Sequence, residues 1–226
     1  MKLSKRLQTI ADFVKKDAIV ADIGTDHAHI PIYLIENKII SKVYACDINS
    51  GPLEKAKENI ESFGVKESIV LRLSNGLDKM SNDEVDTIII AGMGGELIVD
   101  ILERGRRFFD KKNTFVLSPH TKIDEVRSYL LKNGFEIVRE DMCIDEGKFY
   151  TVMEAIYTGS NTIYNDKELL YGRYLIKNKN TILIKFLKKE KTKYLNIISN
   201  TGLNSERKEE LLKILDIIEE TIDEMQ

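Results

Sequence analysis

Apolar residues in the first two thirds of the chain form short uninterrupted runs, and most runs are followed by a stretch with helical spacing. A run without polar alternation is typical of a parallel strand that helices cover on both faces. The pattern therefore predicts five strands that alternate with helices. The first strand begins at residue 19, and the other four cover residues 42–48, 68–73, 85–91 and 114–117. The helices cover residues 4–16, 29–37, 51–62, 96–104 and 123–133.

Two further apolar runs, residues 135–142 and 149–157, flank a turn that contains Gly147. Runs joined in this way predict an antiparallel hairpin. Five strand–helix alternations followed by a hairpin do not match the symmetrical plan of nicotinamide-binding proteins. They fit the α/β, Rossmann-like fold of a class I methyltransferase, with a seven-stranded and mostly parallel sheet.

The pattern changes near Gly159, where a polar segment precedes two long helical tracts. Apolar residues recur at coiled-coil spacing in both tracts, and Lys191 interrupts the first. In the first tract they are Ile184, Leu187, Tyr194 and Ile198, and in the second Leu211, Leu215, Ile218, Ile222 and Met225. With a reversal at residues 201–204, we expect a methyltransferase domain over residues 1–158 and an antiparallel coiled-coil hairpin over residues 159–226. Monomer and weak dimer both stay open.

Length and composition narrow the class of protein. The chain has 226 residues, 42% of them apolar and 31% charged, which is typical of a soluble globular protein. Because no apolar run reaches about 18 residues and no signal-peptide core is present, we expect a cytoplasmic protein without a membrane span. Cys46 and Cys143 lack CxxC spacing, which favours reduced thiols over a disulfide or a zinc site.

The segment at residues 19–30 contains the first candidate site. Its strand runs into Asp22, Gly24 and Asp26, and glycine at such a turn lets a ligand approach the backbone. Many α/β proteins have this turn without a ligand. Asp47 lies 23 residues after Gly24, a spacing at which an acid reaches the hydroxyls of a bound ribose, although it could also be a helix cap.

Two later strand ends carry further candidates. Asn75 and Gly76 follow the third strand, where they could read an adenine ring edge-on or simply form a turn. Residues 92–95 hold three glycines in four positions, and we expect a flexible loop that something approaches closely. His27 and His29 are not expected to bind metal, because a helix would point their imidazoles in different directions and no ligand cluster accompanies them.

The first C-terminal tract is rich in lysine. A net charge of −3 excludes a protein that is basic all over, but not a local basic face. Lysines bunched within nine residues indicate contact with nucleic acid, whereas the alternative is a solvated face or one paired with the acidic second tract. The residues that we single out for this contact are Lys185, Lys188 and Lys189.

Several motifs together resemble one family over nearly the whole chain. They are KLSKRLQTIADFV, VADIGTDHAHIP, IIIAGMGGELI, the SPH after the fifth strand and the EGKFY of the hairpin. The combination resembles the bacterial tRNA (adenine(22)-N1)-methyltransferase family. Two positions depart from its pattern: Asn75 stands where members have Asp, and Ser118 stands where Gln is common. The Asn75 carbonyl oxygen could still accept from an adenine amine.

The resemblance implies methyl transfer from S-adenosylmethionine to N1 of adenine 22 in the D-loop of tRNA, with the helical hairpin holding the tRNA. Residues 91–95 offer no side-chain acceptor for an exocyclic amine, which suits in-line attack by a ring nitrogen. The alternatives are a methyltransferase acting on another RNA, a protein or a small molecule, and a nucleotide-binding module without activity.

Site residues follow from both lines of reasoning. Asp26 is the catalytic candidate, either stabilising charge on the target ring or taking a proton from its amine; its alternative role is binding or capping. The expected cofactor-binding residues are Asp22, Gly24, Thr25, Asp26, His27, Asp47, Ile48, Asn75, Gly76, Leu77, Ala91, Gly92 and Met93. Around the mouth we expect contacts to substrate from Arg6, Pro119, His120 and Tyr150, with Tyr150 stacking on the base.

Overall fold

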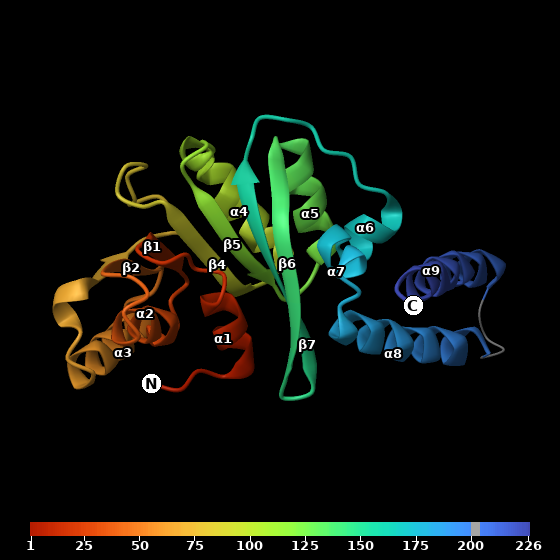
Figure 1. The fold of residues 1–226 in the computed structure, drawn as a ribbon, viewed down its shortest axis with the longest axis horizontal. Coiled ribbons are helices and arrows are strands. Elements are labelled where there is room, and N and C mark those ends of the chain that lie inside the picture. The colour runs from red at the N-terminus through yellow and green to blue at the C-terminus, as the bar shows by residue number, and fades with distance from the viewer. Residues whose placement is uncertain (200–203) are drawn as a thin grey trace.

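The structure is a computed structural model that describes residues 1–199 and 204–226. Within these residues, seven strands form one sheet in the order β3-β2-β1-β4-β5-β7-β6 (Figure 1). They are β1 (Ile19–Ile23), β2 (Lys42–Asp47), β3 (Ile69–Leu73), β4 (Thr87–Met93), β5 (Thr114–Pro119), β6 (Phe135–Asp145) and β7 (Lys148–Tyr157). β7 alone runs opposite to the other six strands, so the predicted seven-stranded, mostly parallel sheet is confirmed.

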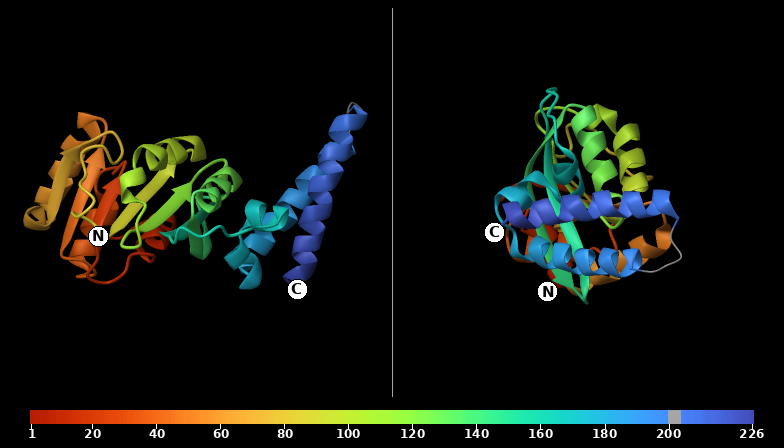
Figure 2. Two further views of the ribbon diagram at one scale, coloured as in Figure 1. Left: turned by 90° about the horizontal axis from the view of Figure 1, so that it is seen from above. Right: turned by 90° about the vertical axis from the view of Figure 1, so that its right-hand side faces the viewer.

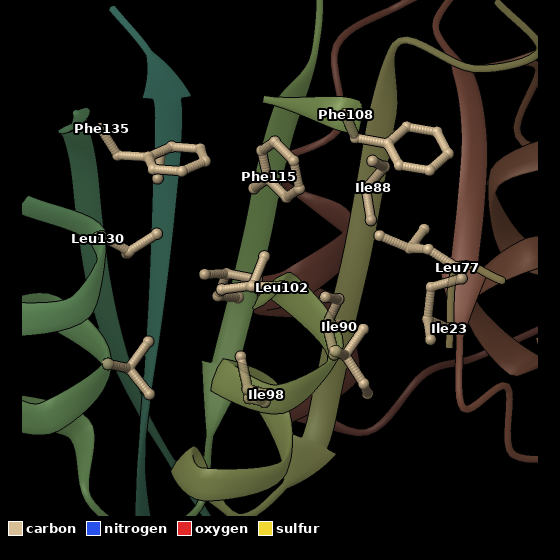
Figure 3. Close-up of a cluster of buried hydrophobic side chains, with 14 of the residues drawn as sticks. Ile23, Leu77, Ile88, Ile90, Ile98, Leu102, Phe108, Phe115, Leu130 and Phe135 are labelled. Atoms are coloured by element: carbon tan, nitrogen blue, oxygen red, sulfur yellow. The ribbon is translucent and has the colours of Figure 1, made fainter. Parts of the chain in front are cut away.

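Helices cover both faces of the sheet (Figure 2). On one face lie α1 (Lys5–Ala11), α2 (His29–Glu36) and α3 (Ser50–Ser62), and on the other lie α4 (Gly95–Arg104) and α5 (Ile123–Lys132), with short 3₁₀ turns at η1 (Lys66–Ser68) and η2 (Arg106–Phe108). In β4, Ile88 and Ile90 pack toward α4 and α5 (Figure 3), whereas Ile89 packs toward α1 and α2. Burial on both faces explains the missing polar alternation.

The first helix is shorter than predicted. α1 ends at Ala11, whereas the apolar spacing predicts helix to residue 16. The backbone N–H groups of Phe13 and Val14 donate to the carbonyls of Ile10 and Ala11, at 3.1 and 3.0 Å, and these bonds close tighter turns. Phe13 and Val14 are buried in these turns, so their apolar spacing reflects core packing rather than helix.

The predicted glycine loop at residues 92–95 is mostly regular structure. β4 continues to Met93, which pairs with Pro119 of β5 across a bulge, and α4 begins at Gly95. A Cβ on Gly95 would lie 2.7 Å from the backbone oxygens of both Thr121 and Lys122. Glycine at this position therefore makes room for a neighbouring loop of the protein itself.

Among the described residues, four helices follow the sheet, where the pattern predicts two. Short helices α6 (Asp166–Tyr171) and α7 (Arg173–Lys177) precede α8 (Thr181–Ile198) and α9 (Ser205–Glu224). The long pair forms an antiparallel hairpin (Figure 2), and Leu211, Leu215 and Ile218 are buried. Residues 201–203 of the predicted reversal lie outside the described residues, while Asn204 caps α9.

A buried ion pair attaches the C-terminal helices to the sheet. Arg127 of α5 donates through Nε to Glu140 Oε1 of β6 at 2.8 Å, with side chains 1% and 0% exposed. Arg127 Nη1 also donates to the carbonyls of Leu169 and Leu170 in α6, and the backbone N–H of Tyr174 in α7 donates to Glu140 Oε2. Both charges are thus satisfied by groups from four elements.

The backbone between α6 and α7 makes room for this pair. Gly172 has φ +91°, and a Cβ there would lie 2.5 Å from Glu140 Oε1. Tyr164, from the segment before α6, packs into the core on the α4 and α5 face of the sheet. We propose a domain boundary between residues 158 and 159. The architecture changes there from a sheet to helices, although the two parts pack against each other. In the described chain, no helix is both long and apolar enough to cross a membrane.

The buried pair predicts an asymmetric mutational response. Arg127→Met should lower the free energy of unfolding by about 3–5 kcal/mol, because it leaves the Glu140 charge buried without a partner. Arg127→Met with Glu140→Leu should recover most of this loss. Chemical denaturation measures the free energy of unfolding of both variants. Arg139→Met, at an exposed position of β6, is the control and should lower this free energy by less than about 1 kcal/mol. Equal losses in the single and double variants would contradict the interpretation.

Candidate cofactor and substrate site

A cavity of about 320 Å³ opens where β1 and β4 end, between α1 and the start of α2. Seven residues expected at the site line it together: Arg6, Asp22, Gly24, Asp26, Ala91, Gly92 and His120. Leu7, His29 and Ile30 also line it and were not predicted. Their signal in the sequence is only that they neighbour predicted residues on α1 and α2.

The turn after β1 is held by the neighbouring strand. The backbone N–H groups of Gly24 and Thr25 donate to the Cys46 carbonyl of β2, at 2.8 and 2.9 Å. Gly24 has φ +76°, a conformation that favours glycine, and a Cβ there would overlap the terminal methyl of Met93. The Met93 side chain therefore occupies the space beside the Gly24 backbone where close approach of a ligand was expected.

The helix after this turn, α2, begins at His29, as predicted. His27 and Ala28 before it have φ of +58° and +57°, so His27 is not helical, although the expected divergence of the two imidazoles requires it to be. The prediction that the imidazoles of His27 and His29 diverge is wrong, because these two left-handed residues bring the rings into a stack, 5.5 Å between centroids. Among the described residues, no group of three or more His, Cys, Asp or Glu side chains could hold a metal ion.

The two acids of this turn differ in exposure. Asp22 is buried, and burial raises the pKa of its carboxyl to about 6, with the charges of Asp47 and Asp26 adding to the effect. The Asp26 side chain is 80% exposed, and its Oδ1 lies 3.1 Å from His27 Nε2. Asp22 is thus the acid on which an unscreened positive charge would act most strongly.

The ends of β2 and β3 form an exposed surface next to the end of β1. We call this surface, which includes Asp47, Ile48 and Asn75, the shelf. Asp47 Oδ1 accepts from the backbone N–H of Asn49 at 2.8 Å, and Ile48 next to it is 59% exposed. The Asn75 carbonyl oxygen accepts from Arg104 Nη2 at 3.1 Å, so the atom expected to meet an adenine amine already has a partner. Arg104 was not predicted here.

The residues after Asn75 are arranged differently from expectation. Gly76 has φ +57°, and its Cα faces Ile101 of α4. Leu77 is 2% exposed and packs in the core (Figure 3), so its side chain cannot frame a ligand at the surface. Its carbonyl accepts from Arg107 Nη2. The sequence could not show this, because an apolar residue after a strand fits both a ligand platform and the core.

Three of the four predicted mouth residues form a cluster. Arg6 Nη1 lies 3.0 Å from His120 Nε2, and its guanidinium lies 5.4 Å from the centre of the Tyr150 ring. His120 and Tyr150 meet edge to face at 5.5 Å. Burial lowers the pKa of His120, and the charges of Arg6 and Lys148 lower it further. Pro119 is buried at the end of β5, where it pairs with Met93.

The three selected lysines are exposed on α8, which packs on the face of the β6–β7 hairpin opposite to the Arg6, His120 and Tyr150 cluster. Phe149, next to Tyr150 in β7, packs edge to face on Phe186 of α8 at 5.3 Å, and Lys189 Nζ lies 5.4 Å from the Phe149 ring centre. Lys191, in contrast, pairs with Glu219 of α9 at 2.8 Å. The two interpretations of the sequence therefore apply to different lysines. Lys191 pairs with the acidic helix, whereas the three selected lysines stay candidates for contact with nucleic acid.

The arrangement fits S-adenosylmethionine. The buried Asp22 carboxylate suits the positive charges of a sulfonium and an ammonium, and Asp47 at the strand end suits ribose hydroxyls. The exposed Ile48 offers an apolar surface for an adenine ring, and the Asn75 amide lies at the end of the neighbouring strand. The residues present thus match the parts of this cofactor in order along the sheet edge.

Asp22 predicts a pH dependence of stability. Because its folded-state pKa of about 6 exceeds the ordinary value, the native state retains a proton that the unfolded chain releases. The free energy of unfolding should therefore fall by about 2.4 kcal/mol as pH rises from 4 to 7. Asp22→Asn should lack this fall. Denaturant titrations at four pH values test it, and parallel curves for the two proteins would refute it.

Comparison with known proteins extends these observations. Residues 3–153 match a family model described as a methyltransferase domain. The chain is 34% identical to the curated tRNA (adenine(22)-N(1))-methyltransferase of Bacillus subtilis over 233 residues, 99% of this chain and 98% of that protein. It is also similar to a Streptococcus pneumoniae structure in complex with S-adenosyl-L-methionine, with 33% identity, TM-score 0.89 and 98% and 100% of the two chains covered.

The similarity includes the C-terminal helices, beyond the residues that the family model matches. M. capricolum TrmK, solved with the cofactor product S-adenosyl-homocysteine, aligns over 100% of both chains with 29% identity and a TM-score of 0.87. The sheet and the helical hairpin are therefore shared as one unit with these proteins. On this evidence the chain belongs to the tRNA (adenine(22)-N1)-methyltransferase family.

Proposed function

We propose that this protein transfers a methyl group from S-adenosylmethionine to N1 of adenine 22 in the D-loop of tRNA, in the cytoplasm. The observation that carries the proposal is one cavity lined both by the acidic turn after β1 and by the Arg6 and His120 side chains at the mouth. Full-length similarity to the curated B. subtilis enzyme supports the choice of substrate.

The chain's own residues divide the work of binding. S-adenosylmethionine supplies an electrophilic methyl group on a sulfonium centre. Asp22 would place negative charge beside that centre, and Asp47 would accept hydrogen bonds from the ribose hydroxyls. Gly24 and Met93 would bound the space between them. These groups bind and orient, and alignment of reacting atoms alone can supply several kcal/mol.

The strand end after β4 favours a ring nitrogen as the nucleophile. Its side chains include no amide or carboxylate, and two of its backbone acceptors are engaged: the Met93 carbonyl accepts from the His120 N–H at 2.8 Å and the Gly94 carbonyl from the Ile98 N–H at 3.1 Å. An exocyclic amine needs acceptors for its hydrogens, whereas N1 carries an in-plane lone pair. The target base would have to leave its stack to reach this cavity.

Positive charge develops on the adenine ring as N1 is alkylated. Asp26 lies on the cavity wall and would stabilise this charge or take a proton from the amine afterwards. Its carboxylate is exposed, so its effect would grow as bound tRNA excludes water. His27 lies beside it and restricts its orientation.

The helical hairpin has one basic and one acidic side. Lys185, Lys188 and Lys189 are exposed on α8, whereas the exposed charges of α9 are mostly acidic. We propose that tRNA contacts α8 while α9 faces away from it. A basic side favours RNA over a protein or a small molecule as the substrate, because its lysines suit a phosphate backbone. The choice of tRNA over another RNA is supported by the similarity to the B. subtilis enzyme.

The direct test is methyl transfer to unmodified tRNA. Purified protein, labelled S-adenosylmethionine and a tRNA transcript should give incorporation, and primer extension should stop at position 22. A transcript with guanine at position 22 is the matched control and should stay unlabelled. Incorporation at another nucleotide would move the target, and binding of the cofactor without incorporation would favour the non-enzymatic alternative.

Asp26 has a kinetic prediction of its own. Asp26→Ala should lower kcat at least tenfold while changing the dissociation constant of S-adenosylmethionine less than threefold, because the group acts on charge that appears only during reaction. Single-turnover kinetics and calorimetry measure the two quantities. Equal losses in both would reassign Asp26 to cofactor binding.

The lysines of α8 have a prediction that depends on salt. Replacing Lys185, Lys188 and Lys189 by Glu should weaken tRNA binding at least tenfold and reduce the slope of log affinity against log salt concentration. The same charge change on α9, with Arg207, Lys208 and Lys213 replaced by Glu, is the control and should alter neither quantity. Equal effects of the two triple variants would indicate general repulsion rather than a contact at α8.

A further inference from the structure

The Arg6 side chain is an unusual cation for its position. It lines the cavity, yet among the described residues its guanidinium forms no ion pair with a carboxylate. Asp145, the nearby acid, accepts from the backbone N–H of Arg6 instead, at 3.1 Å. The pKa of the Asp145 carboxyl is lowered by hydrogen bonds from the Ser4 side chain and the Arg6 N–H and also by the Arg6 charge. The guanidinium nevertheless keeps N–H donors that no carboxylate of the described residues occupies.

Neutral groups hold this cation in place. A guanidinium can only donate, so the 3.0 Å contact of Arg6 Nη1 requires His120 Nε2 to be an unprotonated acceptor. The lowered pKa of His120 agrees with this, and its other charged neighbour, Lys148, also disfavours a second positive charge. The Tyr150 ring lies 5.4 Å below the guanidinium. These neutral contacts thus fix the direction of the Arg6 guanidinium without cancelling its charge.

Space for a ligand is kept beside the guanidinium. A Cβ on Gly92 would lie 3.4 Å from Arg6 Nη1, so a side chain at this position would press against the guanidinium. Asp22 and Asp26 line the same cavity. A ligand that fills the cavity therefore meets two carboxylates and a guanidinium that forms no ion pair among the described residues.

We propose that Arg6, positioned by His120, is the oxyanion receptor of this site. The acidic wall would take the positive groups of the ligand, and Arg6 would take a negative one. The loaded complex has two sources of such an oxyanion, the carboxylate of the cofactor's methionine moiety and a phosphate of the target nucleotide. This inference rests on the proposed function only for the second source.

A positive charge is present at the reacting centre throughout. Methyl transfer moves it from the sulfonium to the adenine ring, so the total charge in the cavity does not change. The Arg6 cation would repel this charge before and after the transfer, and an oxyanion bound beside Arg6 would reduce the repulsion.

The experiment measures two affinities separately for Arg6→Gln. Calorimetry with S-adenosyl-homocysteine, without RNA, reports the carboxylate source, and filter binding of tRNA across a salt series reports the phosphate source. Loss of one charged hydrogen-bonded contact should weaken one of these affinities about ten- to a hundredfold. If the phosphate is the ligand, the salt slope should also fall by about 0.7–0.9.

Matched variants separate the receptor from general effects. Arg139→Gln removes another arginine without a carboxylate partner among the described residues, one that contacts the Asp12 carbonyl outside the cavity, and should change neither affinity. His120→Ala should reproduce part of the Arg6→Gln loss, and His120→Gln, which keeps an acceptor, should restore most of it. Melting temperatures within a few degrees of wild type would establish that the variants are folded.

The outcomes distinguish this inference from the proposed function. An unchanged affinity in both arms for folded Arg6→Gln would overturn it. A response confined to S-adenosyl-homocysteine assigns the carboxylate, and one confined to tRNA assigns the phosphate. If wild-type protein bound the cofactor product through Arg6 but methylated no tRNA, the proposed function would fail and the receptor would stand.

Discussion

The site depends on one backbone carbonyl. Cys46 accepts hydrogen bonds from the N–H groups of both Gly24 and Thr25, so the end of β1 is fixed to the end of β2. This contact brings Asp22 and Asp47 close enough for the charge of one to raise the pKa of the other. The same carbonyl thus sets the position of the buried acid and of the ribose-binding candidate.

The closeness of these acids lowers the stability of the protein when no ligand is bound. Ionised Asp22 is buried near two further acids, and this destabilises the fold at neutral pH. A ligand with positive charge in the cavity would offset the cost, so part of its binding energy comes from relieving repulsion within the protein. The site is therefore arranged for a cation before any ligand is present.

A second constraint positions α8. The Arg127–Glu140 pair joins α5, β6, α6 and α7, and α8 follows α7 after only three residues. Because α8 also packs on Phe149 through Phe186, its lysines have a fixed distance from the mouth of the cavity. The methyltransferase part and the helical part can therefore recognise one substrate together, with the orientation set by buried polar contacts.

Sequence reasoning reached the parts of this structure that are local. Apolar runs gave the strands, and Gly24 marked the turn, because both features are determined by neighbouring residues and by backbone conformation. It missed α6 and α7, the stacked histidines and the extension of β4. These depend on partners distant in sequence or on left-handed residues such as Ala28, for which composition gives no signal. Whether the selected residues bind as expected stays a prediction.

Asn75 shows how one distant partner changes an interpretation. Its oxygen faces Arg104, because a guanidinium can only donate, and the amide nitrogen is therefore turned the other way. Arg104 also contacts Asp78 and Asp100, at 3.3 and 3.1 Å, so its charge is already compensated and an aspartate at position 75 would add a third acid. With asparagine, the side-chain atom that does not contact Arg104 is the amide nitrogen, which is a donor. An adenine edge bound there would meet this donor with a ring nitrogen, whereas the sequence alone suggested an acceptor for its amine.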